Sequence, residues 1–102
     1  MKRTSERKLM VFSGSCNREL SEEIAKCLGV ELGNVKTTKF ANGEIYARYL
    51  QSVRGADVFI IQSVASGDGN NVNDALMELL IMADAAKRAS ARSINAVVTH
   101  SG

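Results

Sequence analysis

Val58-Phe59-Ile60-Ile61-Gln62 is a continuous apolar run that follows the turn-forming stretch Arg54-Gly55-Ala56-Asp57. This composition is typical of a strand in a parallel sheet, because helices bury both faces of such a strand. Residues 9–12 and 94–99 are two more short runs that read as strands. The sequence therefore predicts a sheet with residues 58–62 as a central strand.

The segment after residues 9–12 predicts a helix. Asn17 is a candidate N-cap, and Gly29 suits the left-handed residue that commonly follows a helix. Apolar residues recur between them at helical spacing, at Leu20, Ile24, Cys27 and Leu28. We expect these residues to form the apolar face of this helix.

A second helix is predicted over residues 73–91, with Asn73 as its N-cap. One apolar face is expected at Leu76, Leu79, Leu80 and Ala83, and further apolar residues surround the cylinder at Met77, Ile81 and Met82. A helix that is apolar on several sides is buried against more than a sheet. We expect a partner subunit to cover the remaining surface.

Two alternating segments, residues 35–40 and 45–50, are joined through Asn42-Gly43. Asn-Gly readily supplies the positive φ angles of a two-residue hairpin turn. The expected fold is α/β, with helices flanking a mostly parallel sheet as in a Rossmann-like half-domain and with a projecting β-hairpin. The last strand is expected to leave an unpaired sheet edge, which dimerisation or strand exchange would cover.

The composition bounds the organisation of the chain. Its 102 residues have room for one domain, over residues 8–102, after a polar N-terminal arm at residues 1–7. The apolar fraction of 45% and the charged fraction of 24% are those of an ordinary globular protein. A net charge of +2 without a basic stripe argues against a nucleic-acid partner.

Targeting signals and cysteine chemistry are not indicated. The apolar run after the basic first residues is too short for a signal peptide, and the longest apolar region is too short and too charged to span a membrane. Cys16 and Cys27 have the spacing of neither a redox nor a zinc motif. We therefore expect a cytoplasmic protein with reduced thiols and no membrane partner.

The loop Lys39-Phe40-Ala41-Asn42-Gly43-Glu44 carries an aromatic ring, an amide and a carboxylate. It can be a substrate site, or a plain hairpin turn in which Phe40 packs on the ribbon. Ser13-Gly14-Ser15 can present N–H groups to an anion, or can be an ordinary strand-to-helix turn, since no glycine-rich phosphate motif accompanies it. Lys39, Arg48 and Arg54 are secondary candidates for steering a polyphosphate. His100 has no sequence neighbour that would make it catalytic.

Three stretches together carry a family resemblance: residues 39–44, Ser52-Val53-Arg54-Gly55, and the helical segment 73–91. They resemble the N-terminal domain of ribose-phosphate pyrophosphokinase. The resemblance implies a phosphoribosyltransferase-like half-domain and a reaction in which Mg-ATP donates its diphosphoryl group to ribose 5-phosphate, giving phosphoribosyl pyrophosphate and AMP. It further implies that Phe40 stacks on the adenine of ATP bound in a neighbouring subunit. Asn42, where many relatives carry Asp, and Glu44 would hydrogen-bond near the exocyclic amino edge.

The resemblance also sets an expectation about activity. The family's metal-binding histidine and aspartate, its flexible catalytic loop and its C-terminal domain have no counterpart in these residues. The family implies Mg²⁺ and ATP, but no metal site and no catalytic residue are expected in this chain, and no appreciable turnover is expected from it alone. Its partners would be further copies or full-length synthetase subunits. The alternative is a noncatalytic oligomerisation or regulatory module that pairs through residues 73–91.

Overall fold

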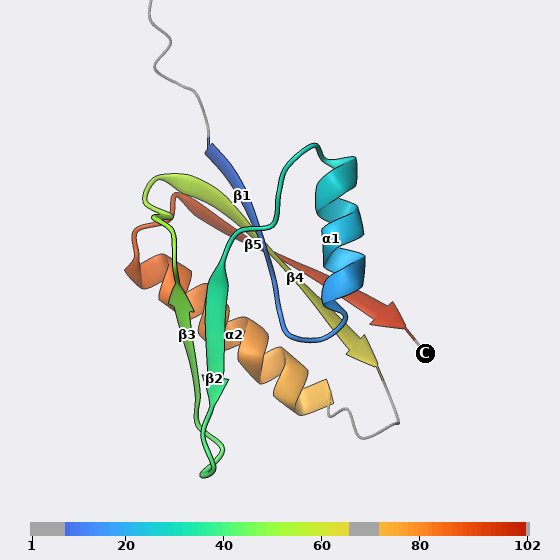
Figure 1. The fold of residues 1–102 in the computed structure, drawn as a ribbon. Helices are drawn as coiled ribbons and strands as arrows, with labels where there is room; N and C mark the ends of the chain where they lie inside the picture. The colour runs from blue at the N-terminus through green and yellow to red at the C-terminus, as the bar shows by residue number, and fades with distance from the viewer. Residues whose placement is uncertain (1–7, 66–71, 102) are drawn as a thin grey trace, which may run out of the picture.

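The computed structural model describes residues 8–65 and 72–101. The predicted arm at residues 1–7 and the predicted polar loop at residues 66–71 lie outside this part. The elements in chain order are β1 (Lys8–Ser13), α1 (Arg18–Cys27), β2 (Val35–Lys39), β3 (Ile45–Tyr49), β4 (Ala56–Ala65), α2 (Val72–Arg88) and β5 (Ser93–Ser101). Strands β1, β4 and β5 form a parallel sheet in the order β1-β4-β5, and β2 and β3 form a separate antiparallel hairpin (Figure 1). The predicted α/β fold is therefore confirmed.

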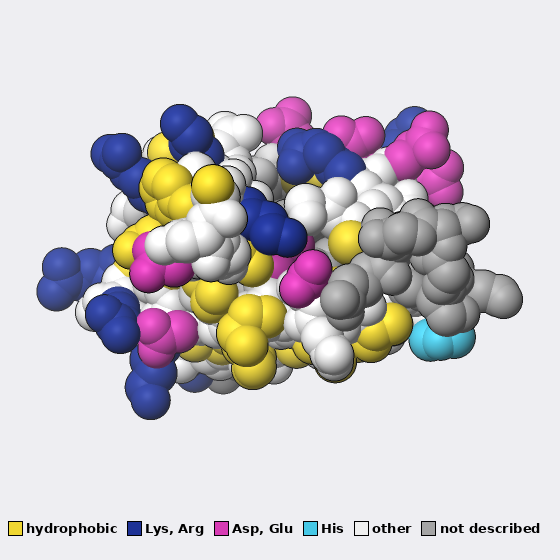
Figure 2. Space-filling view, turned by 90° about the horizontal axis from the view of Figure 1, so that it is seen from below, with side chains coloured by type: hydrophobic (Ala, Val, Ile, Leu, Met, Phe, Trp, Pro, Cys, Tyr) yellow, Lys and Arg dark blue, Asp and Glu magenta, His cyan; other side chains and the backbone are white. Residues whose placement is uncertain are grey.

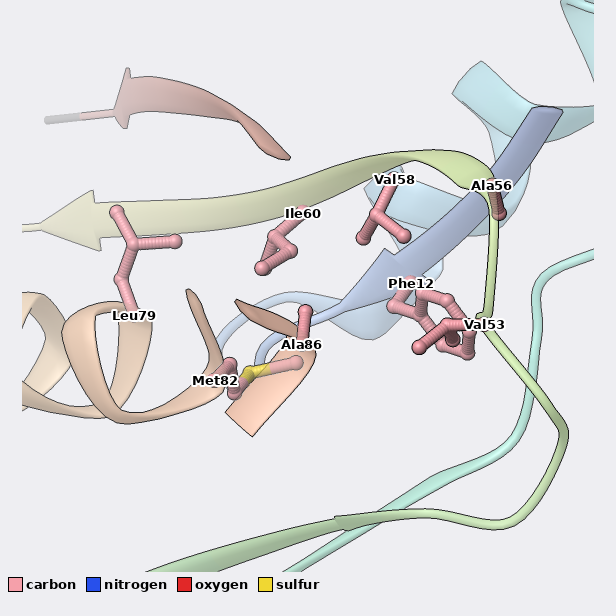
Figure 3. Packing of buried hydrophobic residues seen from close by; sticks show 8 residues of the cluster. All are labelled: Phe12, Val53, Ala56, Val58, Ile60, Leu79, Met82 and Ala86. Atoms are coloured by element: carbon pink, nitrogen blue, oxygen red, sulfur yellow. The ribbon is translucent and has the colours of Figure 1, made fainter. Parts of the chain in front are cut away.

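Side chains point alternately to the two faces of the sheet along each strand, and each face has its own buried core. Phe12, Val58 and Ile60 belong to the larger core, which also contains Leu79 and Met82 of α2 (Figure 3). Their sequence neighbours point the other way, because successive side chains of a strand lie on opposite faces. Both faces of the central strand β4 are thus covered, which explains its continuous apolar run.

The second face packs against α1. Val11 of β1 and Ile61 of β4 form a small core there with Ala25 of α1. The predicted caps of this helix are confirmed: Asn17 Oδ1 accepts a hydrogen bond from the Leu20 N–H at 3.2 Å, and Gly29 has a φ of 76°. The predicted apolar face is wrong in part. The buried residues of α1 are Ser21 and Ala25, whereas Leu28 is 56% exposed. The small residues let α1 approach the sheet closely.

Helix α2 begins at Val72 and ends at Arg88, so Asn73 lies in its first turn and not before it, and the helix is shorter than predicted. Its predicted apolar face is wrong in part: Leu79 is buried and Ala83 packs against the core, but Leu76 and Leu80 are exposed. The buried positions are Ala75, Glu78, Leu79, Met82 and Ala86. Because this helix carries apolar residues on every side, the periodicity of its sequence cannot identify the buried face. The charge of Glu78 also made the face that is in fact buried look like an exposed one.

The hairpin turn is wider than the two-residue turn predicted from Asn42-Gly43. Lys39 pairs with Ile45, the Phe40 N–H donates to Glu44 O at 2.7 Å, and the Gly43 N–H donates to Phe40 O at 2.9 Å. Only Gly43 has a positive φ, of 92°. This is a three-residue loop in which a turn is followed by a left-handed glycine, a common alternative for hairpins.

One face of the hairpin packs on α2 while its tip projects from the molecule (Figure 1). The Tyr49 hydroxyl donates to the Met82 carbonyl at 2.7 Å, and its ring meets Phe12 edge-on with centroids 4.6 Å apart. Burial raises the pKa of Tyr49. Tyr49 thus anchors the base of the hairpin in the core and leaves the tip free to present side chains.

Candidate functional site

Two aromatic rings meet at the tip of the hairpin. The rings of Phe40 and Tyr46 lie edge to face, with centroids 5.3 Å apart and an interplanar angle of 83°. Phe40 is 49% exposed and Tyr46 is 56% exposed. Apolar side chains reach the surface among charged ones on this side of the molecule (Figure 2). Exposed aromatic faces of this kind can stack on a flat ring of a ligand.

Polar groups of the same loop are held by local hydrogen bonds. Asn42 Oδ1 accepts from the Glu44 N–H at 3.0 Å, and the Tyr46 hydroxyl donates to Glu44 Oε1 at 3.4 Å. The Asn42 amide therefore keeps its NH₂ group for a ligand, and the Glu44 carboxylate keeps acceptor capacity. A single carboxylate beside an aromatic ring can accept a hydrogen bond from an amino group on a stacked ring.

The three predicted site residues are brought together by this arrangement. Phe40, Asn42 and Glu44 line an open pocket of about 540 Å³ with Ala41 and Tyr46. Sequence reasoning missed Tyr46. Strand alternation could have found it, because residues 44, 46 and 48 share the outward face of a strand that starts at Ile45.

The three basic residues that the sequence offered for steering a polyphosphate lie in different parts of the structure. Lys39 lies 3.5 Å from Asp74 of α2 as an exposed ion pair, so its charge is used within the chain. Arg48 lies on the outward face, directly opposite Lys36, which the sequence analysis did not single out. Arg54 is exposed in the turn before β4. Of the three, only Arg48 shares a strand and a face with Tyr46.

The turn between β1 and α1 is closed by the chain's own groups. The Ser15 N–H lies 3.2 Å from both carboxylate oxygens of Glu78, and the Ser15 hydroxyl donates to Glu78 Oε1 at 2.8 Å. The Cys16 N–H donates to Gln62 Oε1 at 3.3 Å, and the Gly14 N–H donates to Ile61 O at 2.8 Å. These donors are taken, which favours the ordinary turn over an anion site.

Glu78 is the centre of this closed turn and was not recognised from the sequence. It is 6% exposed and also accepts a hydrogen bond from Gln62 Nε2 at 2.7 Å. Burial, followed by the charge of Glu78, raises the pKa of the Cys16 thiol, while a hydrogen bond with Ser15 lowers it. A Cβ atom at Gly14 would overlap the Gln62 side-chain amide, so glycine is needed for this close approach. A lone carboxylate in an otherwise apolar helical segment was the available signal.

Other kinds of site are not found in the part of the chain that the structure describes. His100 is exposed near the end of β5. Within residues 8–65 and 72–101 there is no group of three or more His, Cys, Asp or Glu side chains that could hold a metal ion. None of the helices described is long and apolar enough to cross a membrane.

Comparison with known proteins gives one consistent relationship. Residues 9–102 match the family model of the N-terminal domain of ribose phosphate pyrophosphokinase. The ribose-phosphate pyrophosphokinase of Streptomyces coelicolor is 52% identical over 102 residues, which are 100% of this chain and 30% of that protein. Ribose-phosphate pyrophosphokinase 2, chloroplastic, of Oryza sativa is 52% identical over 95 residues, which are 93% of this chain and 23% of that protein.

A solved structure agrees with these sequence relatives. The phosphoribosylpyrophosphate synthetase of Mycobacterium smegmatis has a TM-score of 0.82 and 43% identity, over 90% of this chain and 30% of that one. The chain thus spans less than a third of the length of these relatives. Because one relative is named chloroplastic, the cytoplasmic location stays a prediction.

Proposed function

Because the chain belongs to the ribose-phosphate pyrophosphokinase family, we propose that it contributes the N-terminal domain portion of such an enzyme. The reaction would transfer diphosphate from Mg-ATP to ribose 5-phosphate and give phosphoribosyl pyrophosphate and AMP. Residues 8–102 would act as a single α/β unit in this role. What this unit would contribute is recognition of the nucleotide, at the tip of the hairpin.

The observation that carries this proposal is the exposed aromatic ring of Phe40 beside the Glu44 carboxylate and the Asn42 amide in one open pocket. Adenine would stack on Phe40, an interaction worth about 1–3 kcal/mol for a base on an aromatic side chain. Glu44 would accept a hydrogen bond from the exocyclic amino group of adenine, and the Asn42 NH₂ would donate to a ring nitrogen. Because the hairpin projects from the molecule, it could reach ATP held by a neighbouring subunit (Figure 1).

Phosphoryl chemistry would depend on groups beyond those described. Diphosphate transfer needs positioning and neutralisation of charge by Mg²⁺ and basic side chains. The described residues do not form a set of metal ligands, so we assign none of them to Mg²⁺. We therefore expect nucleotide contact without appreciable turnover from this chain alone.

A second candidate function is a noncatalytic oligomerisation or regulatory module that binds further copies or synthetase subunits. The observation in its favour is the exposed apolar side of α2, where Met77 is 51% exposed and Leu80 is 63% exposed. Burial of such side chains against a partner would stabilise an oligomer. This function is compatible with the hairpin site and would become the main one if no nucleotide binds.

Two measurements separate the candidates. Calorimetric titration of the chain with ATP and with GTP should show tighter binding of ATP, since guanine carries a carbonyl where adenine has its amino group. An assay of AMP formation with Mg-ATP and ribose 5-phosphate should show no turnover above buffer. Robust turnover by this chain alone would rule out the noncatalytic module, whereas equal or absent binding of ATP and GTP would contradict adenine recognition at the hairpin.

A further inference from the structure

We propose that Asn42 deamidates spontaneously, so that the chain itself converts this residue into aspartate and isoaspartate. Asn42-Gly43 is the only Asn-Gly pair in the sequence. Both residues are exposed at the tip of the hairpin, between β2 and β3. The modification does not depend on the proposed function, but its consequence for nucleotide binding rests on it.

The reaction is an attack by the main chain on the neighbouring side chain. The Gly43 amide nitrogen loses its proton and bonds to Cγ of Asn42, ammonia leaves, and a succinimide ring closes. Water then opens the ring at either carbonyl, giving aspartate or an isoaspartate whose main chain runs through the former side chain. Because the reacting groups belong to adjacent residues, no second molecule has to position them.

Two features of the loop favour this attack. A Cβ atom at Gly43 would meet no heavy atom outside residues 42–44 within 4 Å, so the attacking nitrogen is not crowded. The Glu44 N–H donates to Asn42 Oδ1 at 3.0 Å, which folds the side-chain amide back toward the main chain that follows it. Negative charge develops on the same oxygen as the nitrogen adds, and this N–H stabilises it.

One contact opposes the reaction. The Gly43 N–H donates to the Phe40 carbonyl at 2.9 Å and must leave it before the nitrogen can attack. The net contribution of such a hydrogen bond is small, so opening it costs at most about tenfold in rate, or roughly 1.4 kcal/mol. The contact therefore delays the modification and does not prevent it.

The other asparagines within residues 8–65 and 72–101 lack this combination. Asn34 is exposed, but the branched side chain of Val35 crowds the nitrogen that would attack it. Asn17 caps α1, Asn73 lies in α2 and Asn95 lies in β5. Asn34 is thus the natural internal control for Asn42.

The products would change the proposed base site. A carboxylate at position 42 cannot donate to a ring nitrogen of adenine, and it adds negative charge to a pocket that Glu44 already lines. Isoaspartate also lengthens the main chain between Phe40 and Glu44, which displaces these two residues relative to each other. A chain that has aged in solution should therefore bind ATP more weakly than a fresh one.

The test follows both asparagines by mass spectrometry while the full chain is incubated at neutral and at mildly alkaline pH. Trypsin releases residues 40–48, in which Asn42 is the only asparagine, and residues 27–36, in which Asn34 is the only one. Two variants accompany the wild type: Asn42→Gln keeps an amide on a longer side chain, and Asn42→Asp represents one product. Calorimetry gives the ATP affinity of each variant and of fresh and aged wild type.

The peptide of Asn42 should convert into two acidic products at least about tenfold faster than that of Asn34, a difference of roughly 1.4 kcal/mol in the barrier. Conversion should be faster at the higher pH, because the attacking nitrogen must lose its proton, and Asn42→Gln should not react over the same time. Equal rates at Asn34 and Asn42, or no conversion at Asn42, would refute the modification.

Aged wild type and Asn42→Asp should both bind ATP about fivefold more weakly than fresh wild type, the equivalent of one hydrogen bond of about 1 kcal/mol. Conversion with unchanged ATP affinity would refute the effect on the base site. Conversion in a chain that binds no ATP even when fresh would refute the proposed function and leave the modification standing.

Discussion

The turn between β1 and α1 and the tip of the hairpin are both short, polar, glycine-containing loops, yet their polar groups serve opposite purposes. In the first, the N–H groups of Ser15 and Cys16 are bound by the side chains of Glu78 and Gln62. At the hairpin tip, the Phe40 ring and the Glu44 carboxylate are exposed. A loop whose donors and acceptors are satisfied internally stabilises the fold, whereas one that leaves them to solvent can bind a ligand.

The largest effect should come from opening the closed turn. Glu78→Ala leaves the Ser15 N–H and the Ser15 hydroxyl without their acceptor and leaves the Gln62 amide only its hydrogen bond to the Ala75 carbonyl. We expect the free energy of unfolding to fall by about 3 kcal/mol, because three donors, two on the exposed Ser15 and one on the buried Gln62, lose a buried charged acceptor. Urea denaturation measures this change. Glu22→Ala, an exposed glutamate on α1 that pairs with Arg18 at 3.4 Å, is the matched control and should cost less than about 1 kcal/mol. Equal costs for the two variants would show that the turn does not depend on Glu78.

A substitution at the hairpin tip should instead weaken ligand binding and leave the stability of the fold almost unchanged. Phe40→Ala should weaken ATP binding by about tenfold, through loss of a stacking contact worth about 1–3 kcal/mol. Its unfolding free energy should change little, because the ring is half exposed. Calorimetry and urea denaturation report the two quantities separately. A large loss of stability with unchanged ATP affinity would make Phe40 a packing residue and the loop a plain turn.

The anchor of the hairpin gives a smaller and pH-dependent effect. Tyr49→Phe removes the hydrogen bond to the Met82 carbonyl and should cost about 1 kcal/mol at neutral pH. Since burial raises the pKa of Tyr49, the folded chain keeps this phenol protonated above pH ~10, where the unfolded chain ionises it. The wild type should therefore lose stability as the pH rises above ~10, while the variant lacks this contribution and the gap between them narrows.

The exposed Tyr46 is the matched control for the loss of a tyrosine hydroxyl. Tyr46→Phe removes an exposed hydroxyl and should change the free energy of unfolding by less than about 0.5 kcal/mol at neutral pH, measured by urea denaturation. A gap between wild type and Tyr49→Phe that stays constant above pH ~10 would contradict burial of the Tyr49 hydroxyl.

The smallest effect concerns Cys16 beside the closed turn. Its raised pKa, due to burial and then to Glu78, lowers the thiolate fraction, so iodoacetamide at pH 8 should label the exposed Cys27 first. Glu78→Gln should speed the labelling of Cys16 by a few-fold relative to Cys27, which serves as the internal reference. Mass spectrometry of the labelled peptides follows both rates. Equal rates in the wild type would mean that Cys16 is not shielded.

Much of the fold followed from local patterns in the sequence. The apolar runs of β1, β4 and β5 and the cap at Asn17 are local signals, and each is confirmed. The buried face of α2 was not predictable, because it is decided by what packs against an apolar helix and not by its own periodicity. The turn at Asn42-Gly43 was placed correctly but assigned the wrong width, since the same residues suit a two-residue or a three-residue loop.

The candidate site was likewise predictable from the sequence only in part. Phe40, Asn42 and Glu44 could be singled out because they are adjacent in the sequence and because the segment resembles a known family. The contribution of Tyr46 depends on strand register, and the closed turn depends on Glu78, which lies 63 residues from Ser15. Contacts of this range are created by folding, so the sequence offered the lone carboxylate of Glu78 as a signal but gave no indication of its partner Ser15. Recognition of the pair required the structure, whereas strand alternation could have identified Tyr46.

The most direct test of the hairpin tip as a nucleotide site is an amide ¹H-¹⁵N NMR titration of the chain with Mg-ATP. The account predicts dispersed signals, with shifts at residues 40–44 and 46 and none in the turn at residues 13–16. Shifts confined to residues 13–16, or dispersed signals that do not move at all, would contradict the assignment of the site to the hairpin.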